Sequence, residues 1–346
     1  MDVLQSALRE LFFIENPQLD KNDPKSRRSL KNYLAQPGIK GVWIYYPWLN
    51  TAIFGPPEHV YYRLRTARNR DLISDKEQHE FRDAVVGVAG LSVGSAAVST
   101  LVSTGGPKQL RIADPDHIEI SNLNRINATL RDVGSNKADV AAKRIWELDP
   151  FADVAVWRNG VSRGDLKPFM KGLDVFVDEM DDIELKVASR LVCRDLKIPV
   201  VMATDNGDSV IVDIERFDLE PRREIFHGNV RISPESLRNM TRREFIALSS
   251  EIIDPEYFTE RQQQSILNIG KSLSGVAQLG TAAAMAGAAV AYVVRRIATN
   301  KSMPSGRYVI SCEHTFIPGY DGVRQTKMRK AHTKDFIKSL GLTTRA

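Results

Sequence analysis

The chain has 346 residues, of which 42% are hydrophobic and 26% are charged, as in an ordinary globular protein with a sizeable core. Its net charge of +5 and pI near 9.1 favour anionic ligands, but the basic residues are spread along the chain, so a nucleic-acid partner is not expected. The densest basic stretch lies between residues 327 and 334, and we interpret it as a solvated tail, with docking of an acidic partner as the alternative.

The first 80 residues are predicted to form an extension that packs on the main domain. Four apolar residues recur there at helical spacing, Leu4, Leu8, Leu11 and Phe12. A polar linker separates them from an aromatic stretch at 42–48, which favours a strand. We therefore expect residues 1–80 to depend on the rest of the chain for their fold.

From residue 84 onward, short apolar runs alternate with helical segments. Strands are expected at 84–89, 110–113, 154–157, 175–177 and 199–202. Helices are expected from Ser95, at 137–148 and through Leu196. Strands that alternate with helices predict the α/β class, with a Rossmann-like, mostly parallel sheet flanked by helices, and we assign this domain to residues 81–216.

The rest of the chain is divided into two parts. In the first part, residues 217–272, the alternation of strands and helices is lost and the sequence becomes polar, which indicates an insertion or substrate lid. The second part, residues 273–346, is expected to contain a helix over 274–298, a strand at 308–312 and the basic tail. The apolar run at 279–294 is shorter than the about 20 residues of a bilayer span, so no membrane is expected. Nothing at the start resembles a signal peptide, which makes the cytoplasm the expected compartment.

The first strand of the α/β segment ends in a glycine-rich turn. Gly87, Gly90 and Gly94 lie in V-G-V-A-G-L-S-V-G-S, where missing side chains let backbone amides and a helix N-terminus face a phosphate. Asp114 ends the next strand, where an acidic residue in a Rossmann-type sheet accepts hydrogen bonds from ribose hydroxyls. The pair predicts a nucleotide site, and a plain structural turn followed by an ordinary strand-end aspartate is the alternative.

The residues after Asp114 distinguish ATP from a dinucleotide. The segment D-P-D-H-I-E-I-S-N-L-N-R ends at Arg125, and V-G-S-N-K ends at Lys137, where a helix begins. A triphosphate attacked at its α-phosphorus needs cations around the phosphates and a carboxylate for Mg²⁺, whereas a dehydrogenase needs neither. Arg125, Lys137 and Asp181 supply both.

In order and spacing, these motifs resemble the ThiF/MoeB/HesA family of ubiquitin-activating-like adenylyltransferases, from the glycine turn to Asp149-Pro150. The resemblance implies that Asp114 binds the ribose and that Asn122 helps to hold the nucleotide, with Asp116 as a further contributor. A cap of a turn is the alternative role for Asn122.

The same resemblance implies that Arg125 and Lys137 contact phosphates. The alternative is that both side chains lie on a solvated surface. It continues more faintly through 177–182, where Asp181 matches the magnesium-binding aspartate of the family, and a helix cap is the alternative for Asp181. The cofactors implied are ATP and Mg²⁺.

An arginine-rich segment precedes the first strand of the sheet. The sequence R-L-R-T-A-R-N-R, which ends at Arg70, resembles the R-Y-x-R-Q segment that lends an arginine to the ATP phosphates of a neighbouring subunit. Arg70 is the candidate for that role, which implies a homodimer, and a surface arginine cluster is the alternative.

The chain departs from the family in its cysteines. Cys193 and Cys312 are isolated, so they cannot form the two C-x-x-C pairs of the zinc site in many relatives, and no zinc is predicted. The 217–272 insertion has no cysteine that would accept a thioester, and we interpret both cysteines as buried apolar residues.

The resulting hypothesis is adenylation of a carboxylate without a later thioester. The resemblance implies a ubiquitin-like or sulfur-carrier protein, or a peptide, as the substrate. The alternatives are a non-catalytic nucleotide-binding scaffold and an NAD-dependent oxidoreductase.

Overall fold

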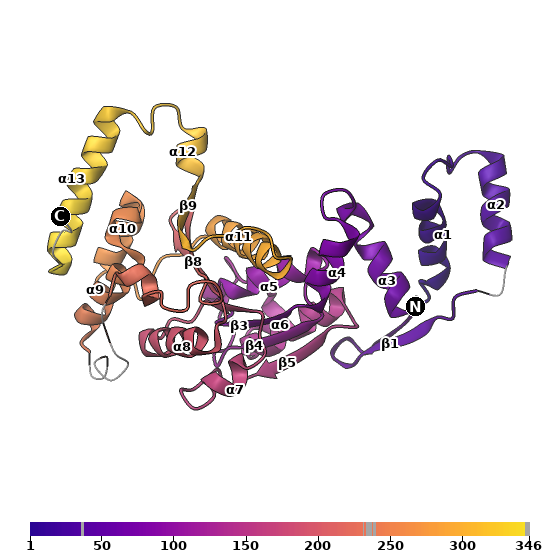
Figure 1. The fold of residues 1–346 in the computed structure, drawn as a ribbon, viewed down its shortest axis with the longest axis horizontal. Coiled ribbons are helices and arrows are strands. Elements are labelled where there is room, and N and C mark those ends of the chain that lie inside the picture. The colour runs from indigo at the N-terminus through magenta and orange to yellow at the C-terminus, as the bar shows by residue number, and fades with distance from the viewer. Residues whose placement is uncertain (36–37, 231, 233–236, 238–239, 343–346) are drawn as a thin grey trace.

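A computed structural model of the chain has a central sheet, an N-terminal arm of helices on one side and a C-terminal arm on the other (Figure 1). It describes residues 1–346 apart from 36–37, 231, 233–236, 238–239 and 343–346.

Seven strands form the sheet, in the order β5-β4-β3-β6-β7-β8-β9. The parallel part consists of β3 (Val85–Ala89), β4 (Gln109–Ala113), β5 (Asp153–Trp157), β6 (Val175–Asp178) and β7 (Val200–Asn206). Strands β8 (Ser209–Glu215) and β9 (Gly306–Ser311) continue it in the antiparallel sense. Strand β6 is apolar up to its last residue and is buried throughout, as expected for a parallel strand between two helix layers. The predicted α/β class with a mostly parallel sheet is confirmed.

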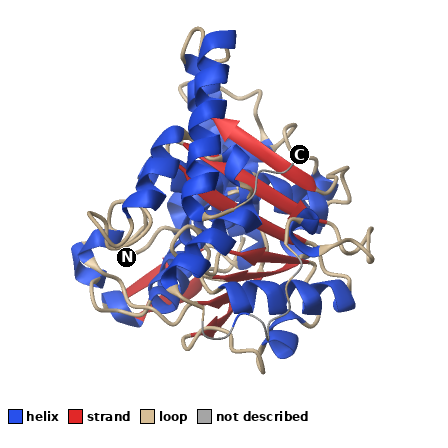
Figure 2. Ribbon diagram, turned by 90° about the vertical axis from the view of Figure 1, so that its left-hand side faces the viewer, coloured by secondary structure: helices blue, strands red, loops and turns tan. Residues whose placement is uncertain are grey.

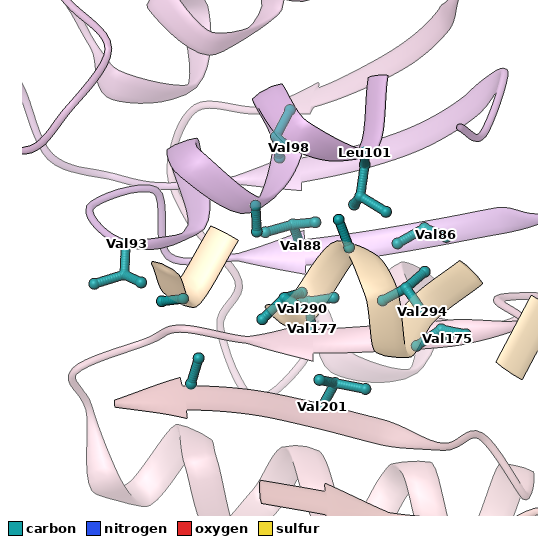
Figure 3. Packing of buried hydrophobic residues seen from close by; sticks show 14 of the residues in the cluster. Val86, Val88, Val93, Val98, Leu101, Val175, Val177, Val201, Val290 and Val294 are labelled. Carbon is teal, nitrogen blue, oxygen red and sulfur yellow. The ribbon is translucent and has the colours of Figure 1, made fainter. Parts of the chain in front are cut away.

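Helices cover both faces of this sheet (Figure 2). One layer consists of α5 (Gly94–Ser103), α6 (Lys137–Leu148) and α11 (Gly280–Ala298), and the other of α7 (Leu166–Met170) and α8 (Ile183–Leu196). Figure 3 shows the valines of β3, β6 and β7 in contact with those of α11: Val86, Val88, Val175, Val177, Val201, Val290 and Val294.

Helix α11 packs very closely on α5. A Cβ added at Gly287 would lie 2.6 Å from the backbone carbon of Ala96, so a larger residue would push the helices apart. The close approach expected from glycine and alanine in this helix is therefore present. By length and composition alone α11 could cross a membrane, but 56% of its most apolar window is buried inside the protein, where it covers the sheet.

The structure corrects several predicted boundaries. The helix expected from residue 274 begins at Gly280, and Cys312 begins α12 (Cys312–Phe316) instead of ending β9. Strand β7 continues beyond 202 and turns at Gly207, whose φ is +68°, into β8, which the sequence interpretation missed. The polar residues at the end of β7 hid the hairpin, although Asn-Gly is a strong hairpin signal.

The segment before the sheet forms several short elements. They are α1 (Leu4–Glu15), α2 (Pro24–Ala35), β1 (Val42–Tyr46), η1 (Pro47–Leu49), β2 (Thr51–Gly55), α3 (Glu58–Arg65), η2 (Ala67–Asn69) and α4 (Asp75–Asp83). Side chains join them to the end of α6, since the Trp48 indole donates to Glu147 at 2.7 Å and the Tyr61 hydroxyl to the carbonyl of Leu148 at 2.6 Å.

The segment after β8 is mostly helical. It contains η5 (Ile225–Gly228), α9 (Arg242–Ile253), η7 (Pro255–Tyr257) and α10 (Glu260–Asn268), and the last described helix is α13 (Val323–Leu340). Phe258 packs edge-on against Phe336 of α13, with ring centroids 6.1 Å apart. The C-terminal helix therefore packs on the segment that was predicted as an insertion.

Candidate functional site

The turn after β3 depends on two of its three glycines. Gly90 has a φ of +87°, and a Cβ there would lie 2.1 Å from the carbonyl oxygen of Glu179. Gly94 is the first residue of α5 and lies against Val88 and the Glu179 side chain. Gly87 lies inside β3, where a Cβ would meet Leu173 at 2.5 Å, so it serves packing on the α7 side of the sheet.

Asp114 lies directly after β4 and beside this turn. Its Oδ2 accepts the backbone N–H of Leu91 at 2.6 Å, and its Oδ1 accepts that of Asp116 at 2.8 Å. The side chain is buried, and burial raises the pKa of Asp114 while the nearby Lys137 opposes that shift. Asp114 thereby holds the glycine turn against the end of β4.

Lys137 is the first residue of α6, and its stem is buried. Its ammonium lies 2.8 Å from Oδ2 of Asp116, whose side chain is exposed. Asn136 caps α6 through its Oδ1, and its Nδ2 donates to the carbonyls of Asp114, Asp116 and Arg158. The sequence interpretation missed Asn136, although asparagine directly before a helix is a preferred cap.

Arg125 reaches the glycine turn from the segment that follows β4. Its Nε donates to Oγ of Ser92 at 3.0 Å. Asn122 is buried, and its Oδ1 accepts the backbone N–H of Glu119 at 3.0 Å, which closes the 3-10 turn η3 (Ile120–Asn122). The side chain of Asn122 therefore caps a turn, while the side chain of Arg125 lies against the glycine turn.

Two hollows near this segment are open to solvent. Arg125 lines a pocket of about 360 Å³ between α5 and the start of α11, together with Ser99 and Gly280. A second hollow lies between α5 and α6. A further 3-10 turn, η4 (Leu130–Asp132), follows in the same connection to α6.

Asp181 follows β6 and is exposed, and its carboxylate makes no hydrogen bond to the described residues. The helix-cap role considered for Asp181 belongs to its neighbour Asp182, which accepts the N–H of Leu185 at 2.9 Å. Asp178 is fully buried and is paired with Arg190 and Lys186. Of these carboxylates, Asp181 is the one that remains available to a ligand.

Two further acidic residues lie at this edge of the sheet, and no motif signals them. Oε1 of Glu179 accepts the N–H of Ala203 at 2.9 Å, and burial raises the pKa of Glu179. Asp205 of β7 is only 4% exposed, yet neither of its carboxylate oxygens makes a hydrogen bond of normal geometry within the described structure. Burial raises the pKa of Asp205 to about 6, against the opposing effects of Arg125 and Gln278.

Arg70 is exposed directly after η2 and does not contact the residues above. Within the same cluster, Arg63 pairs with Glu15 and Arg65 with Asp149. Arg68 and Arg70 make neither a hydrogen bond nor an ion pair with the described residues. An exposed arginine is free to act on another molecule, and the structure does not bring Arg70 to the glycine turn of its own chain.

The carboxyl ends of β3 and β4 thus gather backbone amides, two helix N-termini and two cations around Asp114. This combination suits a nucleotide with phosphates, because helix N-termini and cations attract anions and a strand-end aspartate accepts ribose hydroxyls.

The sequence profile of the ThiF family matches residues 66–333 of this chain. The chain belongs to the ThiF family. It is 38% identical over 266 residues to the uncharacterized protein MT1398 of Mycobacterium tuberculosis, a match that covers 77% of this chain and 37% of that protein. It is 32% identical over 152 residues to the tRNA threonylcarbamoyladenosine dehydratase of Escherichia coli, a match that covers 43% of this chain and 56% of that protein.

Solved structures of this ThiF-family fold agree with the sheet and its helices. The structure of PaaA matches with a TM-score of 0.51 at 19% identity, over 73% of this chain and 77% of that one. The structure of the E. coli dehydratase TcdA matches with a TM-score of 0.50 at 21% identity, over 69% of this chain and 95% of that one. The chain spans about half the length, or less, of the two curated relatives named above. Named ThiF-family relatives are adenylyltransferases and dehydratases.

Proposed function

We propose that this ThiF-family protein adenylates a carboxylate with ATP and Mg²⁺ and releases pyrophosphate. The observation that carries the proposal is the contact of Arg125 with the glycine turn beside Asp114. Asp181, which follows the neighbouring strand β6, has a carboxylate without a hydrogen bond among the described residues. Support for ATP comes from a neighbour of the same fold, since TcdA was solved in complex with AMP.

The nucleotide would lie across the ends of β4 and β3. Each oxygen of Asp114 accepts one backbone hydrogen bond and retains a lone pair, so the carboxylate can still accept ribose hydroxyls. The phosphates would lie on the amides of the glycine turn. Arg125 would then donate to a phosphate oxygen instead of to Ser92, and Lys137 would donate to a phosphate oxygen instead of to Asp116.

The residues present fit a magnesium ion that is held partly by the nucleotide. The described residues contain no group of three His, Cys, Asp or Glu side chains suited to a metal. Mg²⁺ usually binds through one or two carboxylates together with substrate phosphates. Asp181 would supply a carboxylate of this kind, and the bound ion would neutralise phosphate charge.

The chain's own residues would act by position and charge. The substrate carboxylate is ionised at neutral pH, so its in-line attack on the α-phosphate needs no general base. Arg125 and Lys137 would stabilise the charge that develops on the phosphates as pyrophosphate leaves. In a homodimer, Arg70 of the neighbouring subunit would add a further cation.

The substrate class is inferred from relatives. One is named a sulfur carrier protein ThiS adenylyltransferase of E. coli, and another a SAMP-activating enzyme E1 of Haloferax volcanii. The E. coli protein MccB, with a TM-score of 0.50, was solved together with a form of MccA. We infer that this chain acts on the C-terminal carboxylate of a ubiquitin-like or sulfur-carrier protein, or of a peptide.

A thioester step is not part of the proposal. Cys193 is fully buried, and burial raises the pKa of its thiol well above the ordinary value, which keeps it protonated and unreactive. The predicted burial of Cys312 is wrong, because this residue is partly exposed; it follows the edge strand β9, four strands away from β3. The acyl-adenylate would pass directly to its acceptor.

The test is ATP–pyrophosphate exchange by the purified chain with candidate carriers and peptides. Asp181→Asn and Arg125→Ala should each lower kcat at least about 100-fold, because they remove charge that the transition state requires. Asp182→Asn is the matched control: it makes the same charge change one residue away, and asparagine caps a helix as well as aspartate does.

Exchange that survives Asp181→Asn would contradict the assigned site. Tight ATP binding without exchange under any condition would favour a non-catalytic scaffold. Nicotinamide turnover would favour the oxidoreductase alternative, which family membership already argues against.

A further inference from the structure

The carboxylate of Asp205 is buried, and the side chains that stabilise its charge are those of Arg125 and Gln278. Its exposed fraction is 4%, and both oxygens lack a hydrogen bond of normal geometry among the described residues. Buried polar groups in proteins are nearly always paired, and each exception needs an explanation. An unpaired carboxylate that persists in a core is therefore a candidate for a ligand contact.

Asp205 faces the layer that contains the nucleotide site. Side chains alternate along β7, so Asp205 shares the face of Val201 and Ala203, which pack under α5 and α11. Arg125 and Gln278 are the polar side chains that act on it. Their two segments meet there, since the Asn124 amide donates to the carbonyl of Gln278 at 2.9 Å.

The strand order places Asp205 on the far side of the phosphates from the ribose. Asp114 follows β4, the glycine turn follows β3, Asp181 follows β6, and Asp205 lies near the end of β7, in the spatial order β4-β3-β6-β7. Asp205 thus lies on the β7 side of the proposed phosphate site, and a substrate that reaches the α-phosphate from that side would pass its buried carboxylate.

Arg125 cannot neutralise Asp205 in the loaded site if it binds phosphate as proposed. The substrate must then supply the hydrogen-bond donor that pairs with the Asp205 carboxylate. A carboxylate oxygen pairs with a hydrogen-bond donor, and N–H donors of amides or ammonium groups are the donors that accompany biological carboxylates in amino acids and peptides.

We infer that Asp205 selects the acyl substrate by accepting a hydrogen bond from an N–H group adjacent to the carboxylate that is adenylated. This inference rests on the proposed function and specifies the group that lies beside the adenylated carboxylate, which is the last amide of a peptide or the ammonium group of an amino acid. Carboxylic acids without a nearby N–H, such as fatty acids and 2-hydroxy acids, are excluded.

The turn that follows Asp205 is held by the 217–272 segment. The Asn206 amide donates to the carbonyl of Tyr257 at 2.8 Å and accepts the N–H of Thr259 at 2.8 Å. The Thr281 hydroxyl at the start of α11 donates to Asp208 at 2.6 Å. These contacts fix the end of β7, so Asp205 offers its acceptor in a fixed position, as a specificity residue requires.

The test compares three sets of probes in ATP–pyrophosphate exchange by the full chain. The first is a library of acetylated tripeptides with a randomised C-terminal residue, and the second is the matched library in which an ester oxygen replaces the last amide N–H. Free amino acids form the third set and distinguish an ammonium donor from an amide donor. Wild type should discriminate against the ester library by about 100-fold or more in kcat/KM.

Asp205→Asn and Asp205→Val should lose most of that discrimination through KM, while ATP binding, measured by calorimetry, stays unchanged. The Tm of the nucleotide-free variants should equal or exceed that of wild type, because an unpaired buried charge has been removed. Asp208→Asn is the matched control, since that carboxylate already has a partner in Thr281.

Equal exchange with peptide and ester libraries, or discrimination that survives both variants, would overturn the inference while leaving adenylation intact. A Tm lowered by many degrees in both variants would assign Asp205 to folding and would also overturn it. Absence of exchange with every probe, in a chain that binds ATP, would instead count against the proposed function and remove the basis of the inference.

Discussion

Asp205 imposes an electrostatic cost on the ligand-free protein at neutral pH. Burial raises its pKa to about 6, so the folded protein binds this proton more tightly than the unfolded chain does. The favourable contribution is complete below the unfolded pKa and is lost as the pH rises through about 6.

Asp205→Asn removes this titration, so the variant should gain stability relative to wild type as the pH rises. We expect a small difference in the free energy of unfolding at pH 4 and a gain of up to about 3 kcal/mol at pH 7.5. Urea unfolding at the two pH values measures it. A difference that is constant with pH, or that falls as the pH rises, would contradict the buried charge.

Gly90 is the residue whose backbone the site depends on most. Gly90→Ala should destabilise the protein by about 3 kcal/mol or more, because a Cβ at positive φ would also collide with the carbonyl of Glu179. Gly134→Ala is the control: Gly134 has a φ of +83°, but a Cβ there meets no atom within 4 Å, so a loss of about 1 kcal/mol is expected. Similar losses in thermal or urea unfolding would contradict the packing of the turn against Glu179.

At the scale of elements, a buried ion network joins β6 and β8 to the η5 turn. The guanidinium of Arg190 in α8 is fully buried, pairs with Asp178, and donates to Glu215 at 2.7 Å. The ring of Phe226 stacks on it at 4.1 Å, and Phe226 has a φ of +50°. Burial disfavours the charge of Arg190, but Glu215 and Asp178 raise its pKa, so it stays protonated.

Arg190→Met should therefore destabilise the protein by about 3–5 kcal/mol, since Glu215 would remain buried without its cation and Asp178 would keep only Lys186. Adding Asp178→Asn and Glu215→Gln to the same chain should recover much of that loss in urea unfolding. Failure of the triple variant to recover would indicate that packing against Phe226, not charge, dominates at Arg190.

The elements that sequence could predict are those with a strong local pattern. Strands β3, β4 and β6 are short apolar runs, and the residues of the nucleotide site follow them in motifs. Strand β8 was missed because its partner β7 ends in polar residues. The role of Asn136 can be recognised only from the three carbonyls that it binds in the folded protein. Asp205 can be recognised only because tertiary packing buries its carboxylate without a hydrogen bond of normal geometry among the described residues.

At the scale of the whole molecule, we expect the proposed site to include a residue of a second subunit. Arg70 is exposed and makes no contact with its own glycine turn, so its guanidinium is accessible to a neighbouring subunit. The homodimer, like the cytoplasmic location, stays a prediction.

Complementation tests the homodimer directly. Arg70→Ala and Asp181→Asn chains should each be inactive in exchange, but co-refolded mixtures should regain about a quarter of wild-type activity, because half of the dimers would contain one intact site. Arg68→Ala changes a neighbouring arginine that is also exposed, and this variant should remain active. Mixtures that stay inactive although both variants dimerise would contradict an arginine supplied between subunits.

The position of α11 in the chain has a consequence for synthesis. Its residues, Gly280–Ala298, cover valines of β3, β6 and β7 that leave the ribosome some 80 to 200 residues earlier. Helices α5 and α6 emerge early, but until α11 follows, the part of this face over β6 and β7 lacks its cover, and β8 lacks its neighbour β9. The nascent chain must therefore expose this apolar surface until α11 is made, so a protein shortened before residue 280 should associate with chaperones or aggregate rather than fold as a smaller domain.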